Sequence, residues 1–103
     1  VDINNMQADG PSTQMMGFEP LVPKLEAFGW YAQRVDGNDI EAVREAFDRA
    51  RQHPLPQPRM IVADTLMGKG VPFLETRDKS HFIRIEAHEW QLALAALDAG
   101  RNA

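Results

Sequence analysis

The segment Arg59–Asp64, with the sequence RMIVAD, constrains the fold more than any other part of the chain. Its four central residues are all apolar, so a strand formed by them is apolar on both faces. The Pro-rich run PLPQP before it cannot continue a helix and predicts a stiff connection into the strand. Strands of this kind occur mainly in parallel sheets that helices cover. We therefore expect an α/β fold with a mostly parallel sheet and helices on both faces.

Strand and helix patterns alternate along the rest of the chain, as a parallel α/β fold requires. We expect strands at residues 1–3 and 30–35, helices at 20–28, 38–53 and 86–99, and a possible edge strand at 82–85. Each expected helix has an apolar stripe at spacings of three and four residues. The stripes are Leu21, Leu25 and Phe28; Ile40, Val43, Phe47 and Ala50; and Trp90, Ala93, Leu94 and Leu97.

Residues at the helix ends predict where these helices begin and stop. Asn38 is a candidate N-cap, with Glu41 three residues later as its reciprocal partner. Gly29 and Gly100 are candidate stop signals. The Gly-rich segment 65–73 is expected to lack regular structure.

The charge and the cysteine content limit the possible partners. The chain has 15 Asp and Glu residues against 11 Lys and Arg, a net charge of -4. This balance provides no basic field for a nucleic-acid backbone or an anionic membrane surface, so we expect neither partner. The absence of cysteine excludes thiolate sites and is compatible with a reducing compartment, so we expect a cytoplasmic protein. Because the chain begins with Val1 inside an expected strand, we expect that the natural polypeptide starts earlier.

Two loops follow the carboxyl ends of expected strands, which is where open α/β sheets bind ligands. The first loop contains Asn4 and Asn5 and the bent backbone from Met6 to Ala8. Its amide and carbonyl oxygens suit a hard divalent cation such as Mg²⁺ or Ca²⁺. The alternative is an Asx turn in which an asparagine side chain accepts a hydrogen bond from its own backbone.

The second loop contains Gly68-Lys69-Gly70. Glycines expose backbone N–H groups and Lys69 adds a positive charge, so the loop is a candidate phosphate cradle. It does not match the Walker A pattern, which requires Ser or Thr directly after the lysine. The alternative is an ordinary surface turn.

The three histidines differ in their positions. His53 closes one expected helix and His88 lies in the first turn of another, where both are expected to be structural or exposed. His81 follows the Gly-rich loop in a polar stretch on the expected ligand-binding edge. There it could donate a hydrogen bond to a phosphate or exchange a proton near neutral pH, or it could be a plain surface residue.

Together and in order, these motifs resemble the thiamine-diphosphate-binding domain of transketolases, especially the split type whose N-terminal and C-terminal halves are separate chains. The resemblance runs from DINNMQADG through FEPLVPKLEAFGW, VDGNDIEAV and TLMGKGVPFLE to His81. The first motif is similar to the end of the thiamine diphosphate signature, which begins with Gly-Asp-Gly and ends in Asn-Asn. This implies that residues 1–103 are the C-terminal portion of a single thiamine-diphosphate-binding domain, which is incomplete in this chain.

The resemblance also implies roles for five residues. Asn4 would give a side-chain oxygen, and Met6 a main-chain carbonyl, to the Mg²⁺ or Ca²⁺ that holds the cofactor diphosphate. Ala8 and Met67 would line the cofactor pocket. His81 would lie near the diphosphate and the reacting end of the sugar, as a cofactor-binding and catalytic residue. The family's third metal ligand, the Asp of Gly-Asp-Gly, is not in this chain.

The reaction implied by the resemblance is transfer of a two-carbon ketol unit from a ketose or ketose phosphate to an aldose. The glutamate that activates the cofactor would come from a C-terminal subunit or domain, so this chain alone would be inactive. Phe82 stands where the family usually has glycine after the histidine. The alternatives are another thiamine diphosphate enzyme, such as deoxyxylulose phosphate synthase or the α subunit of a 2-oxo acid dehydrogenase, and a cofactor-free α/β assembly module.

Overall fold

A computed structural model describes residues 1–77 and 84–101. Its elements in chain order are β1 (Asp2–Ile3), β2 (Met6–Gln7), β3 (Gly10–Pro11), α1 (Ser12–Met15), α2 (Leu21–Ala27), β4 (Tyr31–Asp36), α3 (Ile40–Gln52), β5 (Arg59–Asp64), α4 (Pro72–Glu75) and α5 (Ala87–Arg101). The strands expected at 1–3, 30–35 and 59–64 correspond to β1, β4 and β5. The helices expected at 20–28, 38–53 and 86–99 correspond to α2, α3 and α5.

The strand with the apolar sequence lies at the centre of the sheet. Strands β1, β5 and β4 form a parallel sheet in that order. β5 pairs with β4 along its whole length, from Arg59 opposite Tyr31 to Asp64 opposite Asp36. Val62, in the middle of β5, has no exposed surface. The predicted parallel sheet is confirmed.

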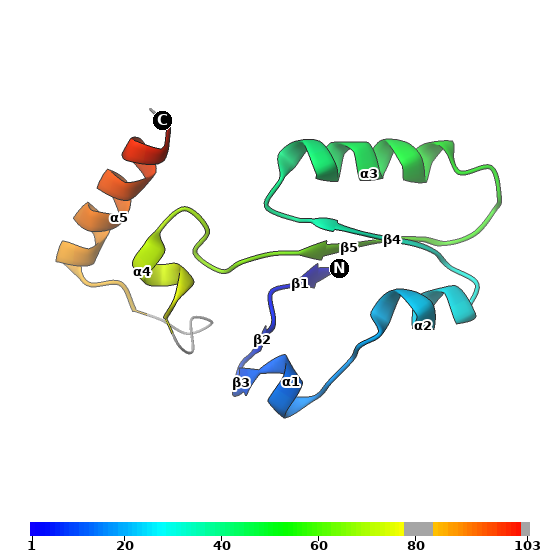
Figure 1. Cartoon of the computed structure of the whole chain (residues 1–103), viewed down its shortest axis with the longest axis horizontal. Coiled ribbons are helices and arrows are strands. Elements are labelled where there is room, and N and C mark those ends of the chain that lie inside the picture. The colour runs from blue at the N-terminus through cyan, green and yellow to red at the C-terminus, as the bar shows by residue number, and fades with distance from the viewer. Residues whose placement is uncertain (78–83, 102–103) are drawn as a thin grey trace.

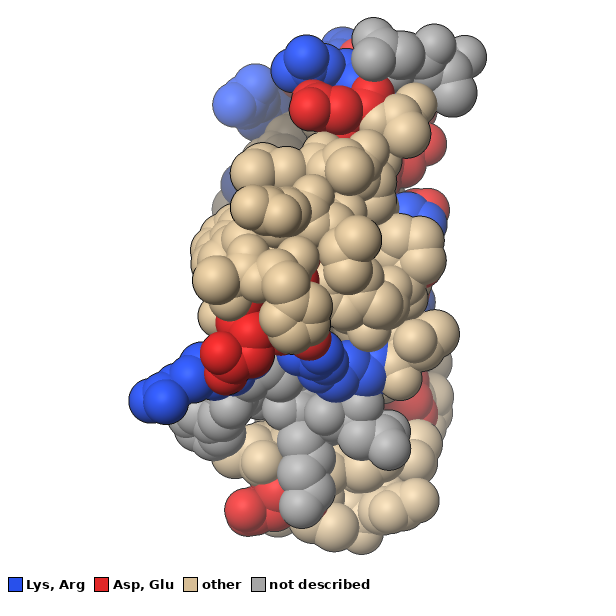
Figure 2. Space-filling view, turned by 90° about the vertical axis from the view of Figure 1, so that its left-hand side faces the viewer, with Lys and Arg blue, Asp and Glu red and all other residues tan. Residues whose placement is uncertain are grey.

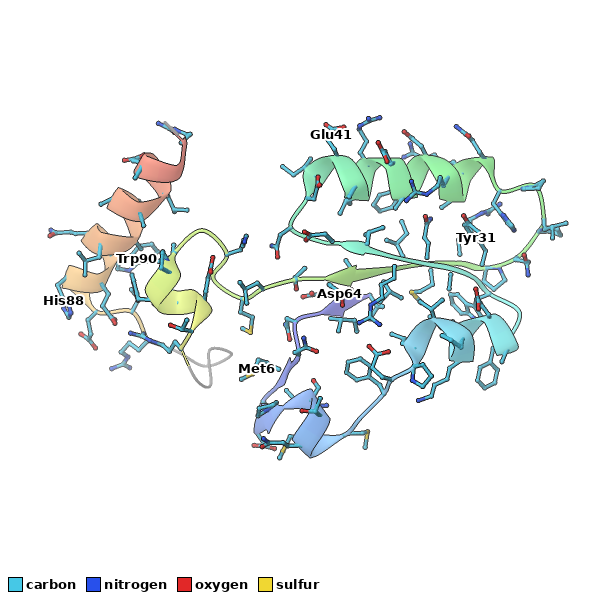
Figure 3. The ribbon with its side chains drawn as sticks, in the orientation of Figure 1. Met6, Tyr31, Glu41, Asp64, His88 and Trp90 are labelled. Atoms are coloured by element: carbon cyan, nitrogen blue, oxygen red, sulfur yellow. The ribbon has the colours of Figure 1, made fainter. Side chains whose placement is uncertain are left out.

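Helices lie on both faces of this sheet, with α3 on one side and α2 on the other (Figure 1). Toward α3, Gln33 Nε2 donates to the Ala46 carbonyl at 2.7 Å, and the Tyr31 ring stacks on His53 with centroids 3.9 Å apart. Figure 3 shows Tyr31 between the sheet and that helix. Successive side chains of a strand point to opposite faces, so Arg34 lies on the face away from α3. There it pairs with Glu19, just before α2. The predicted α/β fold class is confirmed.

Several local expectations are wrong. Asp39, and not Asn38, caps α3, because its Oδ1 accepts from the backbone N–H groups of Glu41 at 2.9 Å and Ala42 at 3.1 Å. Helix α5 continues through Gly100 to Arg101. The short helix α4 begins at Pro72, within the Gly-rich segment, and the first loop folds into the β2–β3 hairpin. Of the possible edge strand at 82–85, residues 82–83 lie outside the described residues, and residues 84–85 form no strand.

The apolar stripes of the helices are only partly buried within this chain. The small residues Ala46, Ala50 and Ala93 are buried, whereas Phe28 is 84% exposed and Ile40 is 83% exposed. On α5, the exposed large side chains are Trp90, Leu92, Leu94 and Leu97, and uncharged side chains gather over this helix in Figure 2. The chain is a flat body of 51 × 35 × 16 Å with a radius of gyration of 16.8 Å. A compact domain of this length has a radius of gyration of about 13 Å, so this chain is more extended than a compact domain.

The ion pairs of Arg34 connect the segment before α2 to the end of the central strand. Arg34 contacts Asp64 through Nε and Nη2, both at 2.7 Å, and Glu19 Oε1 through Nη1, also at 2.7 Å. Two hydrogen bonds lower the pKa of Glu19 below its usual value. The larger effect comes from the Leu21 backbone N–H, and the next from Arg34. Arg34 likewise holds the pKa of Asp64 below its usual value. Both carboxylates are therefore stabilised in the charged form.

This arrangement predicts loss of stability in acid. The ordinary pKa values are 4.5 for Glu19 and 3.8 for Asp64, and the folded values lie lower. The stabilisation is therefore complete above about pH 4.5 and is lost as the pH falls through the folded values. In Arg34→Met, the unfolding midpoint of the full-length protein should decline less steeply below pH 4.5 than in the wild type. Arg44→Met, which removes an exposed arginine from α3, controls for lost charge. This account would be contradicted if the unfolding midpoints of Arg34→Met and the wild type declined equally steeply below pH 4.5.

In the part of the chain that the structure describes, no helix is long and apolar enough to cross a membrane.

Candidate functional site

The first loop leaves β1 through a tight hydrogen-bonded turn. Asn4 Oδ1 accepts from the Met6 backbone N–H at 3.0 Å, so the expected Asx turn is present. Asn5 adopts a left-handed conformation with φ of 60°, which asparagine tolerates better than most residues. The Ser12 N–H then donates to the Asn5 carbonyl at 2.9 Å. These bonds fold the loop back, so that Asn4 and Met6 are held in fixed positions after the strand. An amide oxygen accepts two bonds, so the Asx turn does not exhaust Asn4 Oδ1.

The second loop packs against α4 and uses its own amides internally. The Lys69 N–H donates to the Leu66 carbonyl at 3.2 Å, and the Val71 N–H donates to the Gly68 carbonyl at 3.0 Å. The Gly70 N–H donates to a carboxylate oxygen of Glu75 at 2.8 Å. Three consecutive amides are therefore engaged, two by carbonyls of the loop and one by Glu75 of α4. This geometry favours the surface-turn alternative over a phosphate cradle at Gly68-Lys69-Gly70.

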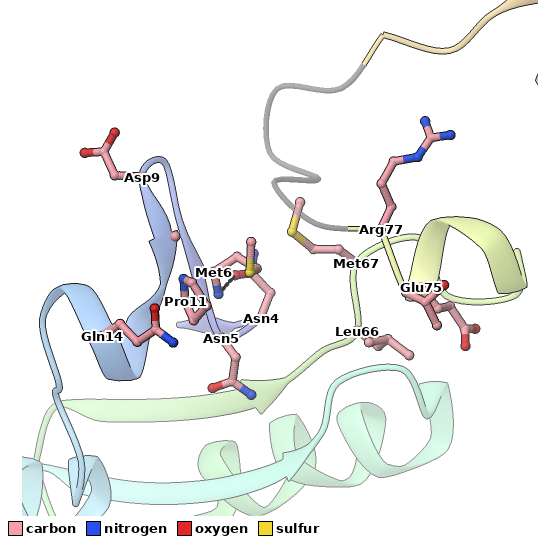
Figure 4. Close-up of a pocket in the computed structure, with 12 residues that line it drawn as sticks. Asn4, Asn5, Met6, Asp9, Pro11, Gln14, Leu66, Met67, Glu75 and Arg77 are labelled. Carbon is pink, nitrogen blue, oxygen red and sulfur yellow. Dashed lines mark hydrogen bonds between the residues drawn. The ribbon is translucent and has the colours of Figure 1, made fainter.

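The two loops meet across one pocket of about 450 Å³ at the carboxyl ends of β1 and β5 (Figure 4). Asn4 and Met6 line one side, and Leu66 and Met67 line the side formed by the loop after β5. The other lining residues are Asn5, Asp9, Gly10, Pro11, Gln14, Glu75, Thr76 and Arg77. Residues more than sixty positions apart in the sequence thus face a common cavity. The parallel pairing of β1 with β5 brings them together.

Three of the five residues expected in the site therefore lie on this pocket: Asn4, Met6 and Met67. Ala8 is exposed in the turn between β2 and β3 and is not among the described residues that line the pocket. Its position differs because the segment Met6–Pro11 folds into a hairpin that carries Ala8 to its tip. His81 lies outside the described residues.

The pocket also contains charged residues that the sequence analysis did not identify. Asp9 belongs to the hairpin turn, and Glu75 and Arg77 come from α4 and the residues after it. Arg77 forms an ion pair with Glu89 of α5 and lies 5.7 Å from the centroid of the Phe73 ring. Two hydrogen bonds lower the pKa of Glu89. The larger effect comes from Arg77, and the next from the Glu86 backbone N–H. Asp9 stands in an Asp-Gly turn pattern, but Glu75 and Arg77 had no motif to mark them.

The charged residues do not form a metal cluster by themselves. Among residues 1–77 and 84–101, no three or more His, Cys, Asp or Glu side chains are arranged to hold a metal ion. The oxygen donors on the pocket are instead mixed, with the amide of Asn4 and the carboxylates of Asp9 and Glu75. Oxygen atoms of these kinds suit Mg²⁺ or Ca²⁺ better than a transition metal. The Asn4 amide oxygen is therefore of a kind that fits part of a coordination shell for a hard cation.

The fold and pocket define a parallel α/β domain with a pocket at the carboxyl ends of its strands, where such sheets bind ligands. The family described as transketolase, thiamine diphosphate binding domain, matches residues 1–99. This chain belongs to that family.

Known relatives agree with this assignment. A transketolase family protein of Sinorhizobium fredii is 62% identical over 103 residues, which are all of this chain and 37% of that protein. A 6-deoxy-6-sulfo-D-fructose transketolase subunit of a Clostridium species is 35% identical over 94% of this chain and 35% of its own length. An apulose-4-phosphate transketolase subunit of Actinobacillus succinogenes is 32% identical over 93% of this chain and 34% of its own length. The chain thus spans little more than a third of these relatives.

Proposed function

We propose that this chain is part of a thiamine-diphosphate-dependent transketolase, in which it supplies one wall of the cofactor and metal site. The observation that carries the proposal is one pocket that Asn4, Met6 and Met67 all line, in a chain that the family matches over residues 1–99. These are three of the residues for which the family resemblance implies contact with the cofactor or its metal.

The proposed contacts use atoms that the chain can offer. Asn4 Oδ1 would bind the metal with the lone pair that the Met6 amide leaves unused, and the Met6 carbonyl would be a second oxygen ligand. Two ligands are fewer than the six that Mg²⁺ requires. The cofactor diphosphate, water and an aspartate from an upstream part of the same domain would complete the shell. Met67 would contribute apolar contact surface across the pocket.

The reaction we propose is the transfer of a two-carbon ketol unit from a ketose or ketose phosphate to an aldose. When bound, the cofactor supplies the carbanion chemistry, and the protein binds and orients the reactants. Relatives named for a sulfo-fructose and for apulose 4-phosphate support a ketose-type donor. Two relatives are named as transketolase subunits, which supports a partner chain, and we propose that a C-terminal subunit or domain supplies the activating glutamate.

The direct test of this function is a transfer assay with the full-length protein and its C-terminal partner. With thiamine diphosphate, Mg²⁺, a ketose donor and an aldose acceptor, we expect a new ketose two carbons longer than the acceptor. Omitting the cofactor or chelating the metal should abolish the product. Failure to form any such product across a panel of ketose donors, in an assembly that binds the cofactor, would contradict the proposed reaction.

His81 is proposed as the catalytic histidine of this site, on the family resemblance alone. Positioned acid–base or hydrogen-bonding groups contribute about 100-fold or more to a rate. In the complete assembly, His81→Ala should lower turnover by about that factor while the unfolding midpoint changes little. His88→Ala is the matched control, because His88 is exposed in the first turn of α5 (Figure 3). Equal turnover of the two variants would assign His81 to the surface.

A further inference from the structure

The turn between β4 and α3, formed by Asp36, Gly37 and Asn38, is bonded to the loop that follows β5. Asn38 Oδ1 accepts from the Leu66 backbone N–H at 2.8 Å, and the Gly37 N–H donates to the Asp64 carbonyl at 2.7 Å. Asp36 Oδ1 accepts from the Asn38 backbone N–H at 2.9 Å, which orients the asparagine. Since Asp39 caps α3, the Asn38 side chain is not needed for the helix.

The same turn approaches the loop too closely for any side chain at position 37. A Cβ on Gly37 would lie 2.6 Å from Thr65 Cγ2, 2.9 Å from Ala63 Cβ and 3.0 Å from the Asp64 carbonyl oxygen. Real Cβ atoms essentially never come within 3.0 Å of such neighbours. Glycine at this position therefore brings the turn against the end of β5, where Asn38 reaches the loop.

The loop is also held from its other side by β1. The Thr65 N–H donates to the Ile3 carbonyl at 3.0 Å, and the Thr65 hydroxyl donates to the Asp2 carboxylate. Asn4 follows Ile3 directly, and Leu66 follows Thr65 directly. The bonds of Thr65 and Leu66 thus fix the separation between the two loops that line the pocket.

We propose that Asn38 is a positioning residue for the cofactor pocket. Asn38 is not itself among the described residues that line the pocket, and it acts by holding the backbone of Leu66, which is. Leu66 and Met67 then present their side chains opposite Asn4 and Met6. This inference rests on the proposed function, because it assumes that thiamine diphosphate occupies this pocket.

The test compares three variants in the full-length protein with its partner chain. Asn38→Ala removes the acceptor for the Leu66 amide, Asn38→Asp keeps an acceptor oxygen, and Asp39→Ala removes the adjacent helix cap. The dissociation constant of thiamine diphosphate in Mg²⁺ is measured by titration calorimetry, and exchange of the Leu66 amide is measured by hydrogen–deuterium exchange. Supporting groups behind ligand-binding residues typically contribute about 10–100-fold to affinity.

We expect Asn38→Ala to bind the cofactor at least about 10-fold more weakly, with faster exchange of the Leu66 amide. Asn38→Asp should restore most of both properties. Asp39→Ala should lower the unfolding midpoint while the cofactor affinity stays as in the wild type. The inference is overturned if Asn38→Ala binds like the wild type, or if Asp39→Ala loses as much affinity. If the wild-type assembly itself binds no thiamine diphosphate, the proposed function fails first, and this inference fails with it.

Discussion

Replacing Asn4 by alanine in the full-length protein with its partner chain should weaken binding of thiamine diphosphate and Mg²⁺ together. The Asx turn holds the side-chain oxygen of Asn4 just after the carboxyl end of β1, where Asn4 lines the pocket. Removing a ligand should cost at least as much as removing its supporting groups, which is about 10–100-fold in affinity. Titration of the cofactor at several Mg²⁺ concentrations measures both affinities, which should fall in parallel.

Two further variants separate loss of a ligand from local unfolding of the hairpin. Asn4→Asp retains an oxygen at the same position, so it should keep most of the affinity. Gln7→Ala removes the hydrogen bond from Gln7 Nε2 to the Met16 carbonyl, 3.1 Å long, without removing a side chain from the pocket lining. It should bind the cofactor as the wild type does. An Asn4→Ala protein with unchanged affinity would remove Asn4 from the proposed metal shell.

Gly68→Ala should cause the largest local loss of stability in the pocket wall. Gly68 has φ of 72°, a left-handed conformation, and an added Cβ would lie 2.5 Å from Leu74 Cβ and 3.1 Å from the Leu74 carbonyl carbon. Left-handed backbone in a non-glycine residue costs about 1–3 kcal/mol, and here the contact with α4 adds to that strain. Hydrogen exchange of the α4 amides measures the local free energy of opening. Cofactor affinity should fall as well, since Met67 is the preceding residue.

Gly29 provides a matched control for this substitution. It also has a left-handed φ, 83°, but an added Cβ there meets no atom within 4 Å. Gly29→Ala should therefore lower the local free energy of opening by the backbone strain alone, and Gly68→Ala should lower it by more. Equal effects of the two substitutions would mean that the packing of Gly68 against α4 contributes nothing.

The central strand could be predicted because its own residues mark it, without reference to distant parts of the chain. RMIVAD is apolar on consecutive positions, and β5 spans the predicted Arg59–Asp64. The hairpin strands β2 and β3 and the helix α4 are two to four residues long, too short for any periodic pattern to mark them. Asn38 and Asp39 are both good N-cap residues, and only the hydrogen bond of Asn38 to Leu66 decides between them.

The residues that line the pocket could be predicted where the sheet topology alone determines where they lie. Asn4 and Met67 each follow the carboxyl end of a parallel strand, and adjacent pairing of β1 with β5 brings them to one pocket. Ala8 is not among the described lining residues, because it lies in the turn of the hairpin. Glu75 and Arg77 were missed because they reach the pocket through α4, whose packing depends on Gly68 and Leu74. The ligand that we propose came from the family resemblance, since the residues alone left the Asx turn and the cation site open.

The most direct measurement of the account is an anomalous difference map from crystals of the full-length assembly with thiamine diphosphate and Ca²⁺. The account predicts a calcium peak about 2.3–2.6 Å from both Asn4 Oδ1 and the Met6 carbonyl oxygen, with the diphosphate beside it. A diphosphate and calcium ion bound elsewhere, with Asn4 making only its bond to the Met6 amide, would contradict it.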